Sequence, residues 1–118
     1  MLRARPTALF VFGDNIERRG NGGQAAQMHG EPNAIGIPTK WRPSMRDGAF
    51  FSDRDYPKVH AEVLPIFRLL SDHLAEGGDI VWPEDGIGTG RAELATRAPK
   101  LAALFEALRT ALMLGTRL

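Results

Sequence analysis

Two glycine-rich stretches of the sequence carry the residue types that bind phosphate. The first spans residues 12–26 and contains Gly22, Gly23 and Gln24; the second spans residues 83–90 and contains Gly86, Ile87, Gly88, Thr89 and Gly90. Each follows an apolar run and precedes a stretch that can begin a helix. Glycine leaves no Cβ in the way of a ligand, and backbone N–H groups ahead of a helix attract anions. One such stretch alone is equally well explained as a flexible turn, but the pair predicts a diphosphate held between them.

Lys40 is the candidate nucleophile, because it stands just past a predicted strand, between Thr39 and Trp41. A lysine amine that loses its proton can attack the anomeric carbon of a sugar. The ordinary alternative is a lysine in solvent. Trp41, together with Phe50 and Phe51, could stack on a base or a ribose, although we expect core packing for at least one of the two phenylalanines.

Several carboxylates flank these stretches. Asp14 and Asn15, directly after Gly13, either satisfy local backbone amides in an Asx turn or accept hydrogen bonds from an adenine or a ribose. Asp85 and Glu93 flank the glycines of the second stretch, residues 86–90, and could act as general acids or bases, or they could be surface carboxylates.

The composition excludes several classes of protein. The 118 residues fit one domain, residues 1–118, and the net charge of +1 offers no strong field for nucleic acid or membranes. Cysteine is absent, and His29, His60 and His73 lack the spacing of a metal site, so we expect no metal and no resident cofactor. Neither a signal peptide nor an apolar run of about 20 residues is present, so we expect a cytoplasmic protein that is not bound to membranes.

The elements that must position these residues follow from the apolar pattern. It predicts strands at residues 8–12, 34–38 and 79–83, a short helix at 24–28, and amphipathic helices at 57–76 and 98–114. Residues 13–23 and 39–54 are expected to be irregular. This order predicts a small three-layer α/β/α domain with a mostly parallel sheet. Ligands in such folds lie beyond the carboxyl ends of the strands.

Local signals refine these boundaries. Pro38 should end its strand or lie on an edge of the sheet, and Pro65 should kink or split the first long helix. Gly77 and Gly78 should end that helix, and Thr96 is the expected N-cap of the last one.

In their order and spacing, these motifs resemble the macrodomain family. The segments that carry the resemblance are Phe12-Gly-Asp-Asn, Arg19-Gly-Asn-Gly-Gly-Gln-Ala-Ala, Ile37-Pro-Thr-Lys and Trp82-Pro-Glu-Asp-Gly-Ile-Gly-Thr-Gly. The most similar branch is that of the terminal ADP-ribose protein glycohydrolases and the antitoxins that remove ADP-ribose from DNA. The match covers residues from about 9 to 108, and the outer strands of a six-stranded sheet are missing.

The resemblance implies a pocket for ADP-ribose. Asp14 would contact the adenine, residues 22–24 would line the distal ribose, and residues 86–90 would hold the diphosphate. Lys40 matches the lysine that attacks the distal ribose in that branch. The aspartate that assists it there is missing, and Glu93 or Asp85 would substitute.

We therefore expect a protein that binds ADP-ribose and hydrolyses its linkage to a protein or nucleic acid. One alternative is a module that binds ADP-ribose or a related nucleotide without turnover. Another is a nucleic-acid-binding accessory protein that uses the basic residues Arg18, Arg19, Lys40, Arg42 and Arg46, against which the nearly neutral charge argues.

Overall fold

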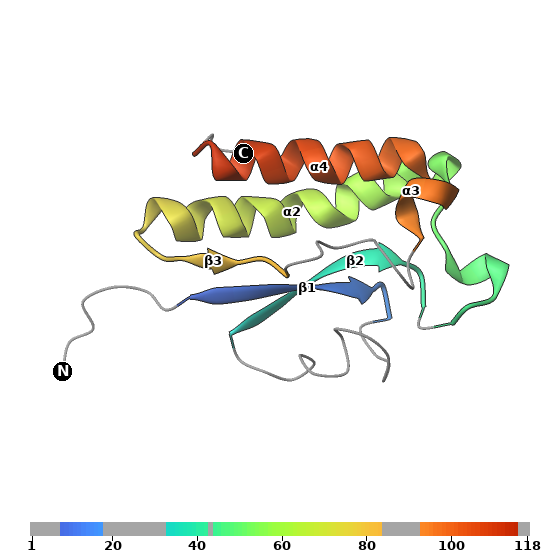
Figure 1. The fold of residues 1–118 in the computed structure, drawn as a ribbon, viewed down its shortest axis with the longest axis horizontal. Coiled ribbons are helices and arrows are strands. Elements are labelled where there is room, and N and C mark those ends of the chain that lie inside the picture. The colour runs from blue at the N-terminus through green and yellow to red at the C-terminus, as the bar shows by residue number, and fades with distance from the viewer. Residues whose placement is uncertain (1–7, 18–32, 43, 84–92, 116–118) are drawn as a thin grey trace.

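The computed structural model describes residues 8–17, 33–42, 44–83 and 93–115 (Figure 1). It contains three strands, β1 (Leu9–Asn15), β2 (Ala34–Lys40) and β3 (Ile80–Val81). All pairings between them are parallel, and the order across the sheet is β2-β1-β3. The prediction of an α/β fold with a parallel sheet is confirmed. Parallel strands end at the same edge of a sheet, so the carboxyl ends of β1 and β2 lie together.

The two long helices, α2 (Tyr56–Ala75) and α4 (Pro99–Met113), lie on the same side of the sheet (Figure 1). The stripe of α2 predicted to be apolar is fully buried at Val59, Val63, Phe67 and Leu70. These side chains share one core with Val11 of β1, Ile37 of β2 and residues of α4. The helix predicted at residues 24–28, which would cover the other face, lies outside the described residues.

The end of α2 follows the glycine signal. Gly77 has a φ of 95°, and its N–H donates to the Leu74 carbonyl at 3.0 Å. The Gly78 N–H donates to the His73 carbonyl at 3.0 Å. These two bonds form a Schellman motif, which satisfies carbonyls that would otherwise lack partners at the helix end. The prediction that Gly77 and Gly78 end the helix is confirmed.

The predictions for Pro38, Pro65 and Thr96 were confirmed in one case and wrong in two. Pro38 lies in β2, an edge strand among the strands described, as predicted. Pro65 does not split α2, which runs through it as one helix. Pro65 and Ala61, whose carbonyl it leaves without a helical donor, are both exposed, so water can satisfy that carbonyl. Thr96 is not the N-cap of α4: it lies in the short helix α3 (Leu94–Arg97), and Ala98 precedes α4.

The strand boundaries also differ from the prediction. β1 continues to Asn15 rather than ending at Phe12, and β2 continues to Lys40 rather than Pro38, while β3 is shorter than residues 79–83. Polar residues therefore occupy the last strand positions. Within the residues described, no helix has the length and apolar character needed to cross a membrane.

Candidate functional site

Four buried polar residues occupy the last positions of β1 and β2. The exposed fractions are 6% for Asp14, 4% for Asn15, 3% for Thr39 and 9% for Lys40. Within the described part of the chain, Ser71 is the one other polar residue buried to this degree. Burial of polar groups is unfavourable unless they find partners, and this is the edge of the sheet where open α/β folds bind ligands. We call these four residues the strand-end cluster.

A local irregularity in the pairing of β1 with β2 brings the cluster together. Asp14 is opposite Pro38 and Asn15 is opposite Lys40, so Thr39 is an extra residue on β2. The Thr39 hydroxyl lies 3.2 Å from the Asp14 carbonyl and donates to it. Such bulges redirect side chains near functional sites. Thr39 therefore joins the end of β2 to the end of β1.

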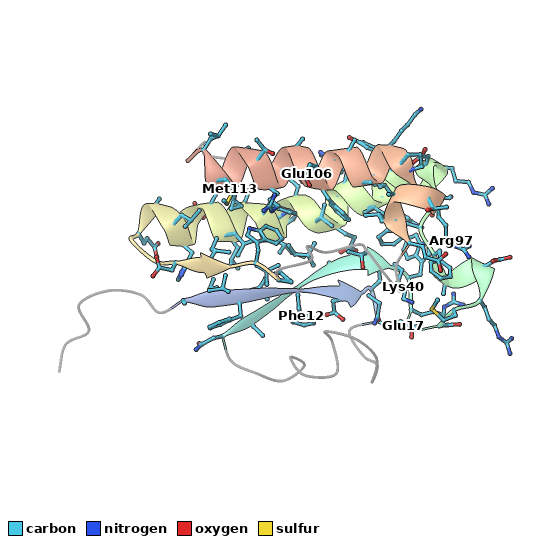
Figure 2. The ribbon with its side chains drawn as sticks, viewed as in Figure 1. Phe12, Glu17, Lys40, Arg97, Glu106 and Met113 are labelled. Atoms are coloured by element: carbon cyan, nitrogen blue, oxygen red, sulfur yellow. The ribbon has the colours of Figure 1, made fainter. Side chains whose placement is uncertain are left out.

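The Asp14 carboxylate is hydrogen-bonded to the next residue and packs against Gly36 of β2. One of its oxygens accepts the Asn15 N–H at 2.8 Å, so it satisfies a local backbone amide, but the bond reaches the next residue rather than the second one on, which an Asx turn requires. Asp14 and Phe12 alternate with the core residue Val11, so they occupy the face of β1 that is turned away from the helices (Figure 2). On β2, Gly36 leaves the space that their side chains fill.

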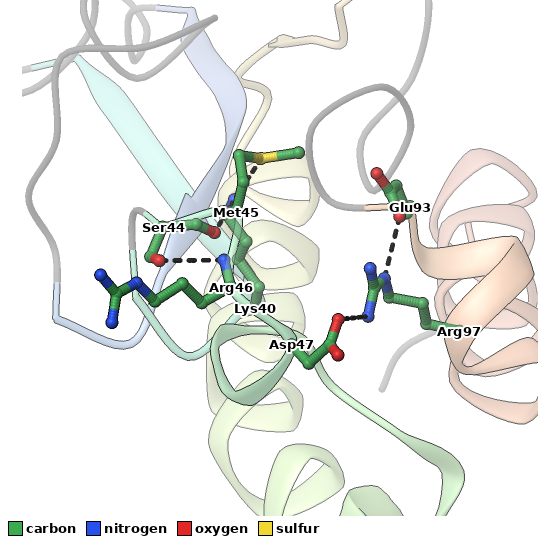
Figure 3. Close-up of polar contacts among 7 residues, drawn as sticks. All are labelled: Lys40, Ser44, Met45, Arg46, Asp47, Glu93 and Arg97. Carbon is green, nitrogen blue, oxygen red and sulfur yellow. Dashed lines mark hydrogen bonds and ion pairs between the residues drawn. The ribbon is translucent and has the colours of Figure 1, made fainter.

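Lys40 is buried, which excludes the alternative of a lysine in solvent. Its amine donates to the Ser44 carbonyl at 3.0 Å and lies 5.0 Å from the centre of the Phe50 ring. The Lys40 amine also donates to the Met45 sulfur at 3.8 Å (Figure 3). An ammonium over an aromatic face is attracted by the ring's negative face. These contacts fix the position of the Lys40 cation.

The chain after Lys40 turns back toward β2 and forms a cleft. The Trp41 N–H donates to the Ala49 carbonyl at 2.7 Å, and Lys40 forms an isolated antiparallel bridge with Phe50. The cleft has a volume of about 360 Å³. Its lining includes three aromatic rings, two aspartates and two arginines: Trp41, Phe50, Phe51, Asp47, Asp55, Arg54 and Arg97. Phe51 belongs to the main core, as expected for at least one phenylalanine of the pair.

Arg97 of α3 joins three parts of this region. Its guanidinium donates to Glu93 at 2.9 Å and to Asp47 at 3.2 Å (Figure 3), and it lies 3.7 Å from the centre of the Phe50 ring. The hydrogen bond to Glu93 is the main reason why the pKa of Arg97 is raised above its ordinary value. Glu93 has a φ of 48°, which is uncommon for a residue with a side chain. The candidate general acid Glu93 is therefore engaged by Arg97.

Sequence reasoning missed Arg97. The spacing of four residues between Glu93 and Arg97 predicts an ion pair on a helix, and this signal was available. The contact with Asp47 spans 50 residues of sequence, and no local pattern indicates it.

The structure describes seven of the predicted site residues: Gly13, Asp14, Asn15, Thr39, Lys40, Trp41 and Glu93. The others lie outside the described residues: Gly22, Gly23, Gln24, Asp85, Gly86, Ile87, Gly88, Thr89 and Gly90. The predicted diphosphate cradle between the two glycine-rich stretches therefore stays a prediction. Among the residues described, no three histidine or carboxylate side chains are grouped as a metal site requires.

Comparison with known families assigns the chain. A family described as "Family of unknown function (DUF7831)" matches residues 1–108, and the chain belongs to this family. The comparison with curated proteins finds no match, and neither does the comparison with solved structures. The macrodomain assignment is therefore wrong, since the family that matches nearly the whole chain is a different one. Glycine-rich segments after buried strands serve many α/β folds, so their order alone does not identify a family.

Proposed function

We propose that this member of a family of unknown function binds ADP-ribose, or a similar nucleotide with a diphosphate, at the carboxyl ends of β1 and β2. The observation that carries the proposal is the burial of Lys40 beside Asp14, Asn15 and Thr39 at neighbouring ends of parallel strands. Ligands of open parallel sheets bind at this edge.

The chemistry of the strand-end cluster suits such a ligand. The Lys40 ammonium can bind a phosphate as a compact positive charge. The carboxylate of Asp14 and the amide of Asn15 can accept hydrogen bonds from ribose hydroxyls or from an amino group. Together, a cation and hydrogen-bond acceptors on adjacent strands match the phosphate and the sugar of a nucleotide.

Binding without turnover fits the contacts better than hydrolysis does. In hydrolysis, the uncharged Lys40 amine would attack the anomeric carbon of the distal ribose. The bond to the acceptor would break, the acceptor would leave with the electron pair and take a proton, and water would then release ADP-ribose from the lysine. The Lys40 amine is instead hydrogen-bonded to the Ser44 carbonyl, and Glu93 is hydrogen-bonded to Arg97.

Calorimetric titration with ADP-ribose tests the proposal. We expect Lys40→Met to weaken binding by about tenfold or more, because a hydrogen bond between charged groups is lost. Lys100→Met is the matched control, since Lys100 is exposed at the start of α4 and should bind as the wild type does. Absence of binding by the wild type, or equal affinity of all three proteins, contradicts the proposal.

Incubation with ADP-ribosylated DNA and protein separates binding from hydrolysis. We expect the wild type to release no ADP-ribose while binding it free. Release that disappears in Lys40→Met would establish the hydrolytic mechanism instead, whereas equal release by both proteins would exclude Lys40 as the nucleophile.

A nucleic-acid accessory role gains little support from the described arginines. Arg42 lies 3.7 Å from the Glu17 carboxylate, which offsets its charge. That role predicts affinity for unmodified strands that falls steeply with salt, and this result would favour it over the nucleotide site.

A further inference from the structure

We infer that the cleft between Trp41 and Arg97 binds the nucleobase of the nucleotide, an inference that rests on the proposed function. The cleft is formed by the chain directly after β2 and by α3. Its volume of about 360 Å³ is at the small end of the range for ligand pockets, which suits one planar base.

Planar groups form the walls of the cleft. Trp41 is half-buried, and its ring meets Phe51 edge to face with the ring centres 5.1 Å apart. The cleft is also lined by Arg97 of α3, whose guanidinium lies 3.7 Å from the centre of the Phe50 ring. Proteins hold bases by stacking them on aromatic rings and on guanidinium planes. Both kinds of group therefore line the cleft, where the Lys58 amine lies over the Trp41 ring at 5.9 Å from its centre.

Hydrogen bonds hold the walls in place before a ligand arrives. The Trp41 indole N–H donates to Asp55 at 3.4 Å, and the same carboxylate accepts the Ser52 N–H at 2.9 Å. Arg97 is held by Glu93 and by Asp47. A site whose side chains are already fixed loses less conformational entropy on binding.

The cleft adjoins the strand-end cluster through Phe50. The same ring is contacted by the Lys40 amine, at 5.0 Å from its centre, and by Arg97. A nucleotide that places phosphate on Lys40 can therefore place its base beside Trp41. The Asp47 carboxylate at the cleft is 95% exposed and can accept from the amino group of a base such as adenine.

Tryptophan fluorescence tests this inference, because Trp41 and Trp82 are the two tryptophans of the chain. The Trp82→Phe protein reports on Trp41 alone, and the Trp41→Phe protein reports on Trp82, which packs against Phe67. The probes are adenosine, which lacks phosphate, and ribose 5-phosphate, which lacks a base. We expect adenosine to quench Trp41 but not Trp82, and ribose 5-phosphate to quench neither.

Affinity for ADP-ribose supplies the second measurement. We expect Trp41→Ala to weaken binding by about tenfold, as for loss of one stacked base, and Trp41→Phe to restore part of the loss. Circular dichroism checks that each variant is folded. If Trp41→Ala does not fold, quenching in the Trp82→Phe protein decides the question alone.

The outcomes distinguish this inference from the proposed function. ADP-ribose binding that needs Lys40 but leaves Trp41 fluorescence unchanged overturns the base site and keeps the proposed function. If adenosine quenches Trp41 but Lys40→Met leaves the affinity for ADP-ribose unchanged, the base site is kept and the proposed role of Lys40 is overturned. No quenching of Trp41 by adenosine, or quenching of Trp41 by ribose 5-phosphate as strong as that by adenosine, overturns the inference.

Discussion

The two ends of the parallel sheet are built from different kinds of residue. At the amino end, glycines and backbone bonds make a tight connection: the Schellman motif ends α2, and the Leu9 N–H donates to the Asp79 carbonyl at 2.9 Å. At the carboxyl end, the strand-end cluster buries four polar side chains. The first arrangement stabilises the fold at low cost, whereas the second requires partners for every buried polar group.

Cleft size alone would favour the amino end of the sheet over the proposed site. A cleft of about 510 Å³ lies at the amino end, larger than the cleft beside Trp41. Its lining consists mostly of exposed side chains from one stripe of α2, namely Pro65, Arg68, Leu69, Asp72 and Glu76. Charged residues are ordinarily exposed at a protein surface. The buried polar residues, rather than the volume, are therefore the reason why we propose the carboxyl end as the ligand site.

The largest effect is expected from Gly36→Ala, which disturbs the face that carries Asp14. The new methyl carbon would lie 2.9 Å from the Asp14 Cβ and 2.9 Å from the Phe12 ring. Both side chains are buried and have little room to move. We expect the free energy of unfolding to fall by about 2–3 kcal/mol, measured by denaturant titration.

The same variant links stability to the site. Because Asp14 must shift, ADP-ribose affinity should fall together with stability when binding is measured on the folded protein. A loss of stability with unchanged affinity would show that Asp14 takes no part in the binding site.

A smaller effect is expected at the amino end from Gly78→Ala. The new methyl would overlap the His73 ring. Among the described residues, the His73 Nε2 has no hydrogen-bond partner, so the ring is held by packing and can rotate away. We expect a loss of about 1–2 kcal/mol in unfolding free energy and no change in ADP-ribose affinity.

Gly48→Ala is the matched control for this prediction. A methyl group at Gly48 would have nothing within 4 Å, so stability should stay the same or rise slightly. If Gly78→Ala weakens ligand binding as strongly as Gly36→Ala does, the distinction between the two ends of the sheet fails.

The sequence predicted the amino end more accurately because the signals there are local. The last apolar residues of the α2 stripe, Phe67 and Leu70, and the pair Gly77-Gly78 act within one helix and its end. The carboxyl ends of the strands were placed too early because Asp14 and Lys40 are polar, and strand patterns are recognised from apolar residues. Their place in β1 and β2 depends on pairing between segments 25 residues apart.

In the candidate site, too, local features could be predicted from the sequence and contacts between distant segments could not. The positions of Lys40 and Trp41 at the end of a strand followed from the apolar run before them. The burial of Lys40 under Phe50 did not, because it depends on how residues 41–50 turn back on β2. The family assignment failed for a related reason, since short glycine motifs recur in unrelated folds.

The smallest effect is expected from Asp47→Asn, which removes one ion pair beside the strand-end cluster. The Asp47 side chain is 95% exposed, and water competes for its bond to Arg97. Exposed pairs of this kind contribute little to stability, and Arg97 keeps its contacts with Glu93 and Phe50. We expect the denaturation midpoint to match that of the wild type at low and at high salt.

A midpoint lowered further than in Gly78→Ala would mean that exposed charges, rather than buried contacts, hold residues 41–50 against α3. In that case the stability of the carboxyl end of the sheet would depend on ionic strength. The two ends would then differ in their electrostatic interactions rather than in the burial of polar side chains.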